Sequence, residues 1–146
     1  MNATSEKVTV RGEFYLRKVR QVDGAVLEEY RDANLIVNLG RNSLAQLLGG
    51  ASVFAVDGIA FGEGTAAPAL GDTALTNQLD KALLSVTYPA TGQVAFNWSL
   101  ETSEGNGLSI TEFGLTNNGD LFARKTRAAI AKDNTFRLEG TWTIIF

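Results

Sequence analysis

The chain contains neither cysteine nor histidine. The absence of thiols excludes a disulfide framework, and the absence of thiolates and imidazoles excludes the metal sites that depend on them. Nucleophile pairs of the Ser–His and Cys–His type are excluded too, together with the most common general base near neutral pH. Chemistry that uses carboxylates, Ser–Lys pairs or tyrosines stays open. We therefore expect a protein that is not an enzyme and that needs no cofactor.

Positive charge and long apolar runs are also scarce. The net charge is −3 and the isoelectric point is near 4.9, so the chain lacks the basic surface that collects nucleic-acid phosphates. No stretch approaches the roughly 20 apolar residues that a membrane-spanning helix needs. Met1 to Lys7 are polar and lack the apolar centre of a secretion signal. These features predict no nucleic-acid partner, no membrane partner, and a chain that stays in the cytosol or in something assembled there.

What the chain does contain favours a folded all-β protein. Its 146 residues are 45% hydrophobic, which is enough for one domain with a buried core. Fifteen glycines against two prolines indicate many turns. We predict an N-terminal arm over residues 1–7 and a single domain over residues 8–146, built as a β-sandwich or a jelly-roll-like domain with one short helix.

Alternating apolar residues carry the strand predictions. In residues 94–100 and 136–146 nearly every second side chain is large and apolar, which places Trp98 and Trp142 on the inward face of two strands. Residues 8–17 alternate in the same way, and Asp23-Gly24 forms a tight hairpin turn. We also predict one strand over residues 53–61, interrupted at Asp57-Gly58, and another over residues 79–88, which Pro89 ends.

Helical spacing is confined to one place. Leu44, Leu47 and Leu48 share a face of a short helix over residues 40–48, with Asn38 as its N-cap and Gly49-Gly50 as its end. Asp72 is expected to cap a single helical turn over residues 73–77.

One acidic residue interrupts a strand. The alternation of residues 108–115 changes phase at Glu112, which predicts a β-bulge there. We expect Glu112 to pair with an arginine such as Arg124, or to cap backbone exposed at the bulge, and we favour such a structural role over a catalytic one. The other loop acids are expected to face water, because they lack the spacing of a calcium loop; a calcium site or a glycosidase acid pair is the alternative for them. These acids are Asp57, Glu63, Asp72, Glu101, Glu104 and Asp120.

Two short basic groups stand out in this acidic chain. A basic patch could dock onto an acidic neighbour and set its register. We therefore predict a partner interface at Arg17, Lys18, Arg20, Arg124, Lys125 and Arg127. The segment before Val8 and the residues around Val19 to Val22 are placed to act as arms.

Three blocks of sequence have a familiar order and spacing. The first is Asn34-Leu35-Ile36-Val37-Asn38-Leu39-Gly40, followed by the short helix. The second is Ile59-Ala60-Phe61-Gly62-Glu63-Gly64-Thr65-Ala66-Ala67-Pro68, then Asp72-Thr73-Ala74-Leu75. The third is Ile110-Thr111-Glu112-Phe113-Gly114-Leu115, then Gly119-Asp120-Leu121-Phe122-Ala123-Arg124. These blocks resemble small virion structural proteins of tailed bacteriophages, over nearly the whole of residues 8–146.

The resemblance implies a β-sandwich, no catalysis, and symmetric copies that bind other virion proteins. The family pattern includes capsid decoration or cement proteins as well as tail-fibre, collar and baseplate components. We favour a decoration protein that bridges capsid subunits as a dimer or trimer, because the compact domain lacks a shaft or a separate tip. The expected location is the virion, assembled in the cytoplasm of the bacterial host.

Two other functions are weighed against this one. A carbohydrate-binding module would present outward aromatic residues, for which Tyr15, Tyr30 and Tyr88 are the candidates. An enzyme that uses carboxylates alone would need two of them about 5–10 Å apart in a cleft.

Overall fold

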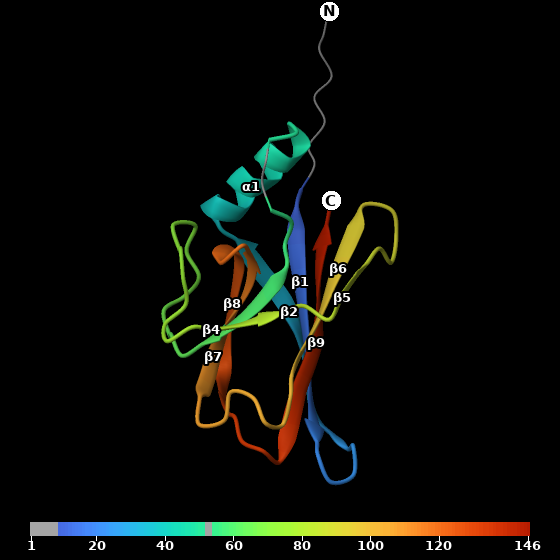
Figure 1. Cartoon of the computed structure of the whole chain (residues 1–146), viewed down its shortest axis with the longest axis vertical. Coiled ribbons are helices and arrows are strands. Elements are labelled where there is room, and N and C mark those ends of the chain that lie inside the picture. Colours follow the sequence, from blue (N-terminus) through green and yellow to red (C-terminus); the bar gives the residue numbers. More distant parts are fainter. Residues whose placement is uncertain (1–8, 52–53) are drawn as a thin grey trace, which may run out of the picture.

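A computed structural model describes residues 9–51 and 54–146. In this part of the chain there are nine β-strands and one α-helix, and all paired strands are antiparallel (Figure 1). The elements are β1 Arg11–Arg20, β2 Val26–Ile36, α1 Asn38–Leu48, β3 Gly58–Gly62, β4 Leu79–Ala82, β5 Ser85–Thr87, β6 Gln93–Leu100, β7 Ser109–Asn117, β8 Asp120–Ala131 and β9 Phe136–Ile145. The prediction of an all-β fold with one short helix is confirmed, and the predicted arm over residues 1–7 lies outside the described residues.

The strands form one curled sheet in the order β4-β3-β7-β8-β2-β1-β9-β6-β5. Strand β2 belongs to both halves, because it pairs with β1 along most of its length and with β8 through Leu35 and Ile36. The two halves face each other as the layers of a sandwich do. Their contact is aromatic: the ring of Phe113 on β7 lies 4.8 Å from that of Phe14 on β1 and 5.8 Å from that of Trp98 on β6.

The inward parity predicted for the two tryptophans is confirmed. Trp98 and Trp142 are 1% and 0% exposed, respectively. Trp98 lies over Gly140, its neighbour on β9, where an added Cβ would come within 2.5 Å of the indole ring and 2.1 Å of the Tyr15 carbonyl oxygen. Glycine is therefore the residue that lets a tryptophan fit between two strands of this half.

The segment over residues 79–88 differs from its prediction as one strand. Residues Leu79–Ala82 form β4, the edge of one half of the sheet, and Ser85–Thr87 form β5, the edge of the other half. Between them, Leu83 donates a backbone hydrogen bond to Asp57 and Leu84 donates one to Asn97. The chain therefore crosses from one edge of the curled sheet to the other within a few residues.

Two of the capping predictions are wrong. Helix α1 begins at Asn38 itself, with Val37 in the N-cap position and no side-chain hydrogen bond from the described residues at this end. Asp72 precedes no helical turn, because its carboxylate accepts hydrogen bonds from elsewhere, as described below. The end of α1 is as predicted: the backbone N–H of Gly49 donates to Ala45. The strand predicted over residues 53–61 is shorter in the structure, where β3 begins at Gly58; Val53 is not among the described residues.

The three blocks that carry the resemblance meet in space. A small second core joins Val37 of the first block, Ala60 and Leu75 of the second, and Leu121 of the third. Helix α1 packs closely on β8, since a Cβ on Gly40 would lie 2.1 Å from the carbonyl oxygen of Phe122. The blocks therefore form one structural unit beside the main core.

In the part of the chain that the structure describes, no helix has the length and apolar character needed to cross a bilayer.

Candidate docking surface

The first predicted basic group lies on β1 and is largely neutralised within the chain. The guanidinium of Arg17 forms an ion pair with Glu139 on β9, and Arg20 pairs with Asp23 at 3.1 Å in the hairpin turn. The ammonium of Lys18 lies 4.3 Å from the centre of the Phe136 ring. The neighbouring Val19, predicted as part of an arm, is instead buried in the core.

The second basic group lies on β8 and is neutralised by β2. Lys125 forms an ion pair with Asp32 at 2.6 Å, and Arg127 forms one with Glu28. The side chains of Arg124, Lys125 and Arg127 are only 5%, 11% and 9% exposed. They therefore offer little surface to a partner. The partner interface predicted at the six basic residues stays a prediction, and the structure does not join them into one open basic patch.

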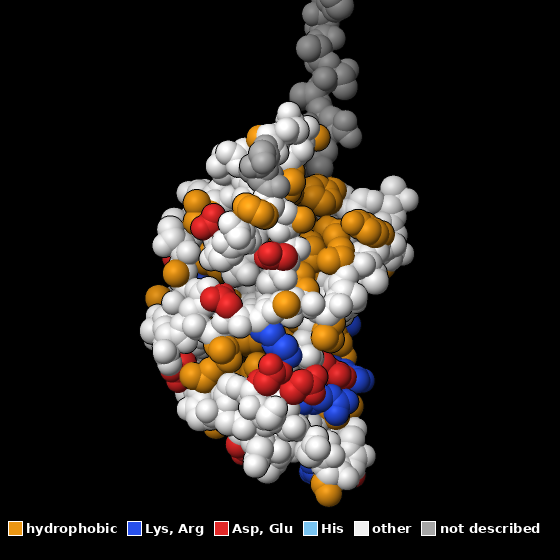
Figure 2. Space-filling view, viewed as in Figure 1, with side chains coloured by type: hydrophobic (Ala, Val, Ile, Leu, Met, Phe, Trp, Pro, Cys, Tyr) orange, Lys and Arg blue, Asp and Glu red, His pale blue; other side chains and the backbone are white. Residues whose placement is uncertain are grey.

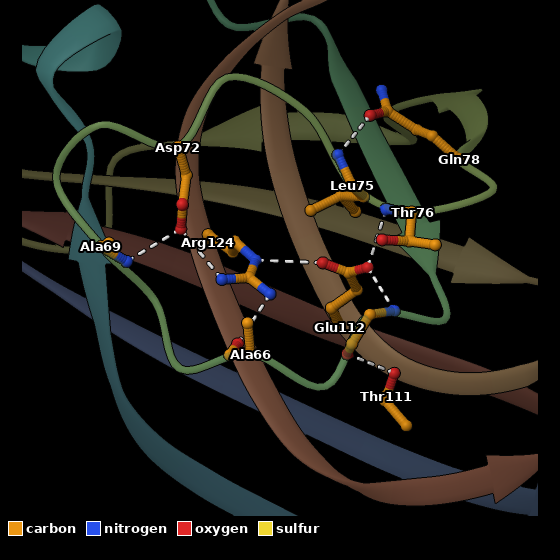
Figure 3. Close-up of polar contacts among 10 residues, drawn as sticks. Ala66, Ala69, Asp72, Leu75, Thr76, Gln78, Thr111, Glu112 and Arg124 are labelled. Atoms are coloured by element: carbon orange, nitrogen blue, oxygen red, sulfur yellow. Dashed lines mark hydrogen bonds and ion pairs between the residues drawn. The ribbon is translucent and has the colours of Figure 1, made fainter.

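Glu112 lies at the centre of a buried polar cluster (Figure 3). The prediction of a bulge here is confirmed, because the register between β7 and β8 shifts between Ile110 and Glu112. One carboxylate oxygen of Glu112 accepts hydrogen bonds from the backbone N–H groups of Gly64, at 2.5 Å, and Thr76, at 2.9 Å. The other accepts one from Nε of Arg124 at 3.0 Å. The predicted pairing of Glu112 with Arg124 is confirmed, and the backbone that Glu112 caps belongs to the loop after β3 and not to the bulge itself.

Arg124 continues this cluster into the loop that follows β3. Its two terminal nitrogens donate to Asp72, at 2.9 Å, and to the carbonyl oxygen of Ala66, at 2.9 Å. Asp72 also accepts the N–H of Ala69 at 2.8 Å, and this bond, with the ion pair to Arg124, holds the pKa of the Asp72 carboxyl below its usual value. The loop over residues 62–78 is therefore pinned to β7 and β8 by paired charges. Such a cluster stabilises the loop.

Of the loop acids named in the sequence, Glu63 and Asp72 line one hollow together with Glu112 and Arg124. Glu63 accepts hydrogen bonds from Asn77 and from the backbone of Ser109, while Glu104 pairs with Lys81 at 2.5 Å. Over residues 9–51 and 54–146, no three carboxylates come together as the ligands of a metal ion would.

An apolar surface is left open at one end of the sheet. Along β9 the inward positions are buried up to Ile144, but Phe146, next in this series, is 50% exposed. On the edge strand, Val86 faces inward beside Phe96 and is 42% exposed, and Tyr88 beyond it is 78% exposed. We call Val10, Val86, Tyr88, Val94 and Phe146 the apolar end.

The apolar end is large enough to matter. An aromatic residue buries about 150–250 Å², so the open parts of Tyr88 and Phe146 alone amount to roughly 200–300 Å². That approaches the size of the largest apolar patches found on ordinary monomers, which mark interaction sites. Figure 2 shows a patch of apolar side chains below α1 on the right of the view, with separate acidic side chains to its left and a cluster of Asp, Glu, Lys and Arg side chains beneath it.

A groove adjoins this end, between α1 and the start of the β1–β2 pair. It has a volume of about 620 Å³. Leu35, Ile36 and Leu44 give it an apolar floor, and Arg11 and Arg41 line it as well. The alternation of the first strand placed Arg11 on a face expected to meet water or a partner, but neither arginine was among the predicted interface residues, because only the fold brings the two to one groove.

Known proteins give no guide to this surface. No family model, curated protein or solved structure matches the chain. Function therefore has to be argued from the chain's own residues.

Proposed function

We propose that this chain is a non-catalytic structural component of a tailed-phage virion, specifically a decoration protein that stabilises the head by bridging capsid subunits. The observation that carries the proposal is the apolar end. Most lysine and arginine side chains of the described residues are paired with carboxylates, whereas Tyr88 and Phe146 present apolar surface to water. Such an apolar patch is unusual on a protein that works as a monomer, and it is expected where neighbouring proteins cover the surface.

The sequence blocks support the same proposal. They resemble virion structural proteins, and they build the unit in which Glu112 and Arg124 pin the loop over residues 62–78. The residues of these blocks hold the fold together, so the resemblance reflects a shared architecture. Attachment is then the task of a different surface, and the apolar end lies outside the three blocks.

The carbohydrate-binding alternative draws less support from the aromatic residues. Tyr30 packs edge-on against Phe14 with ring centres 6.2 Å apart, and the hydroxyl of Tyr15 donates to Glu29 at 3.0 Å. Of the three tyrosines named for a sugar site, Tyr88 is the one that stands widely open.

The test uses particles of the phage that encodes the chain. We expect purified particles to contain it in many copies, and particles made without it to lose resistance to heat or low salt. Added recombinant protein should restore that resistance. The double variant Tyr88→Ser/Phe146→Ser should fail to do so, whereas Val22→Ser, which removes an exposed apolar side chain at the β1–β2 turn, should restore it.

Electron microscopy of labelled particles separates the locations. Label over the head supports decoration, and label over the tail would replace it with a tail-fibre, collar or baseplate role. Particles that lack the chain altogether would end the proposal.

A further inference from the structure

We propose that the groove between α1 and the β1–β2 pair binds a segment of a partner protein that carries carboxylates beside large apolar side chains. This inference rests on the proposed function, because it takes the end of the molecule that bears α1 as the attachment surface. It specifies the chemistry of the partner, which the apolar end alone does not.

The charges of the groove carry the first step. Most cations on the sheet are held by carboxylates in the chain, as Arg17 is by Glu139 and Arg31 is by Glu13. Arg11 and Arg41 differ, because neither forms an ion pair with a carboxylate of residues 9–51 or 54–146, and both line the same groove. Two guanidinium groups in one groove attract an anion, and their planar forks match a carboxylate.

The floor of the groove carries the second step. It is formed by aliphatic side chains, with Ile36 7% exposed and Leu35 and Leu44 partly buried. A free phosphate or a nucleic-acid backbone would pair with the guanidinium groups but would leave this apolar floor exposed to water. A peptide with alternating acidic and apolar side chains satisfies both, because it places carboxylates at the rim and apolar groups on the floor.

Asn34 adds a third observation. Its side chain lines the groove, and neither its amide nitrogen nor its amide oxygen has a hydrogen-bond partner within the described part of the chain. The amide lies against Gly12, where a Cβ would fall 1.8 Å from the Asn34 oxygen. Buried amides without partners are costly and rare. A rotation of the Asn34 side chain toward a bound peptide would give both atoms a backbone partner.

The test measures binding of two end-blocked, fluorescein-labelled peptides to the full chain by fluorescence polarisation. One is Leu-Glu-Phe-Glu-Leu and the other is Leu-Gln-Phe-Gln-Leu, which keeps the apolar groups and removes the charge. We expect the acidic peptide to bind at least about tenfold more tightly at low salt. The difference should shrink near 0.5 M salt, where the Debye length is only about 4–5 Å.

Variants locate the binding. Arg11→Glu/Arg41→Glu should weaken binding of the acidic peptide by about tenfold or more, while Arg20→Glu, at the far turn, should change it by less than about twofold. Circular dichroism checks that each variant is folded, and Arg11→Gln/Arg41→Gln serves if the Glu pair is not. Equal binding of the two peptides, no binding of either, or full binding by the double variant would overturn the inference.

The particle assay distinguishes the two proposals. If the Arg11→Gln/Arg41→Gln protein restores heat resistance as well as the parent does, the groove is not used and the virion role stands. If particles do not contain the chain, the virion role fails whatever the peptides do.

Discussion

Replacing Glu112 by glutamine keeps the size of the side chain and removes its charge. Three donors converge on the carboxylate: two backbone N–H groups, of Gly64 and Thr76, and Nε of Arg124. An amide has one oxygen and one NH₂ group. In either orientation the NH₂ faces a donor, so either the backbone groups or the guanidinium lose their acceptor.

The magnitude follows from burial. The side chains of Glu112 and Arg124 are 1% and 5% exposed, and breaking a buried pair by removing one partner costs about 3–5 kcal/mol. A domain of this size has about 5–15 kcal/mol in total, so Glu112→Gln should still fold. Its melting temperature should fall by roughly 10–20 °C.

Urea unfolding followed by circular dichroism gives the free-energy change, and amide hydrogen exchange locates it. The N–H groups of Gly64 and Thr76 should exchange much faster in the variant. The matched control is Glu13→Gln, which loses an exposed ion pair to Arg31 and should cost about 0–1 kcal/mol. If Glu112→Gln costs no more than this control, the buried carboxylate does not hold the loop and the reasoning fails.

Three further predictions concern packing, capping and pH. Gly140→Ala forces a Cβ against the Trp98 ring and the neighbouring strand, so urea unfolding should show a loss of at least about 1–3 kcal/mol, and an unchanged midpoint would contradict the packing. Asn38→Ala should cost less than about 0.5 kcal/mol in the same assay, because no side-chain hydrogen bond caps α1 within the described residues; a loss near 1 kcal/mol would restore the capping role. Burial lowers the pKa of Lys132, so the unfolded chain binds this proton more tightly than the folded one. Stability should therefore rise as the pH increases from the lowered pKa toward 10.5, a range without histidine or cysteine titration, and Lys132→Met should abolish the rise.

The sequence was most informative where one face of a strand is buried. Alternation at residues 94–100 and 136–146 predicted the inward tryptophans, because a period of two leaves little choice of face. The break in alternation at Glu112 predicted both the bulge and the link to Arg124. Here the local pattern and the long-range contact coincide, since the two residues lie on neighbouring strands.

The predictions that failed depended on partners far away in the sequence. The sequence of residues 79–88 predicted one strand because nothing local marks the point where the pairing changes. In the structure β4 pairs with β3, whereas β5 pairs with β6. Asp72 looked like a helix cap, but Arg124, 52 positions along the chain, competes for its carboxylate. The capping pattern at Asn38 was close to correct, yet the N-cap position is one residue earlier, at Val37, and Asn38 lies inside the first turn of the helix.

The basic groups show the same limit for function. Lys125 and Arg127 look free in the sequence, but Asp32 and Glu28 of β2 reach them across a separation of more than 90 residues. The alternation around Arg11 shows only which face of the strand it occupies, and nothing local connects it with Arg41. Surface charge could be counted from the sequence, whereas which charges remain unpaired depends on the fold.

The crossing from β4 to β5 has a consequence for how the protein would be damaged. Both rims of the sheet are covered by strands of four and three residues that belong to one continuous stretch of chain. A single protease cut at Leu83 or Leu84, or one local unfolding event, would release both edge strands, β4 and β5, together. The longer strands next to them, β3 and β6, would then expose unpaired backbone at the two edges of the curled sheet. A damaged copy would have two unpaired strand edges, and each could pair with a strand of another copy. Aggregation of the protein should therefore begin at this short crossing.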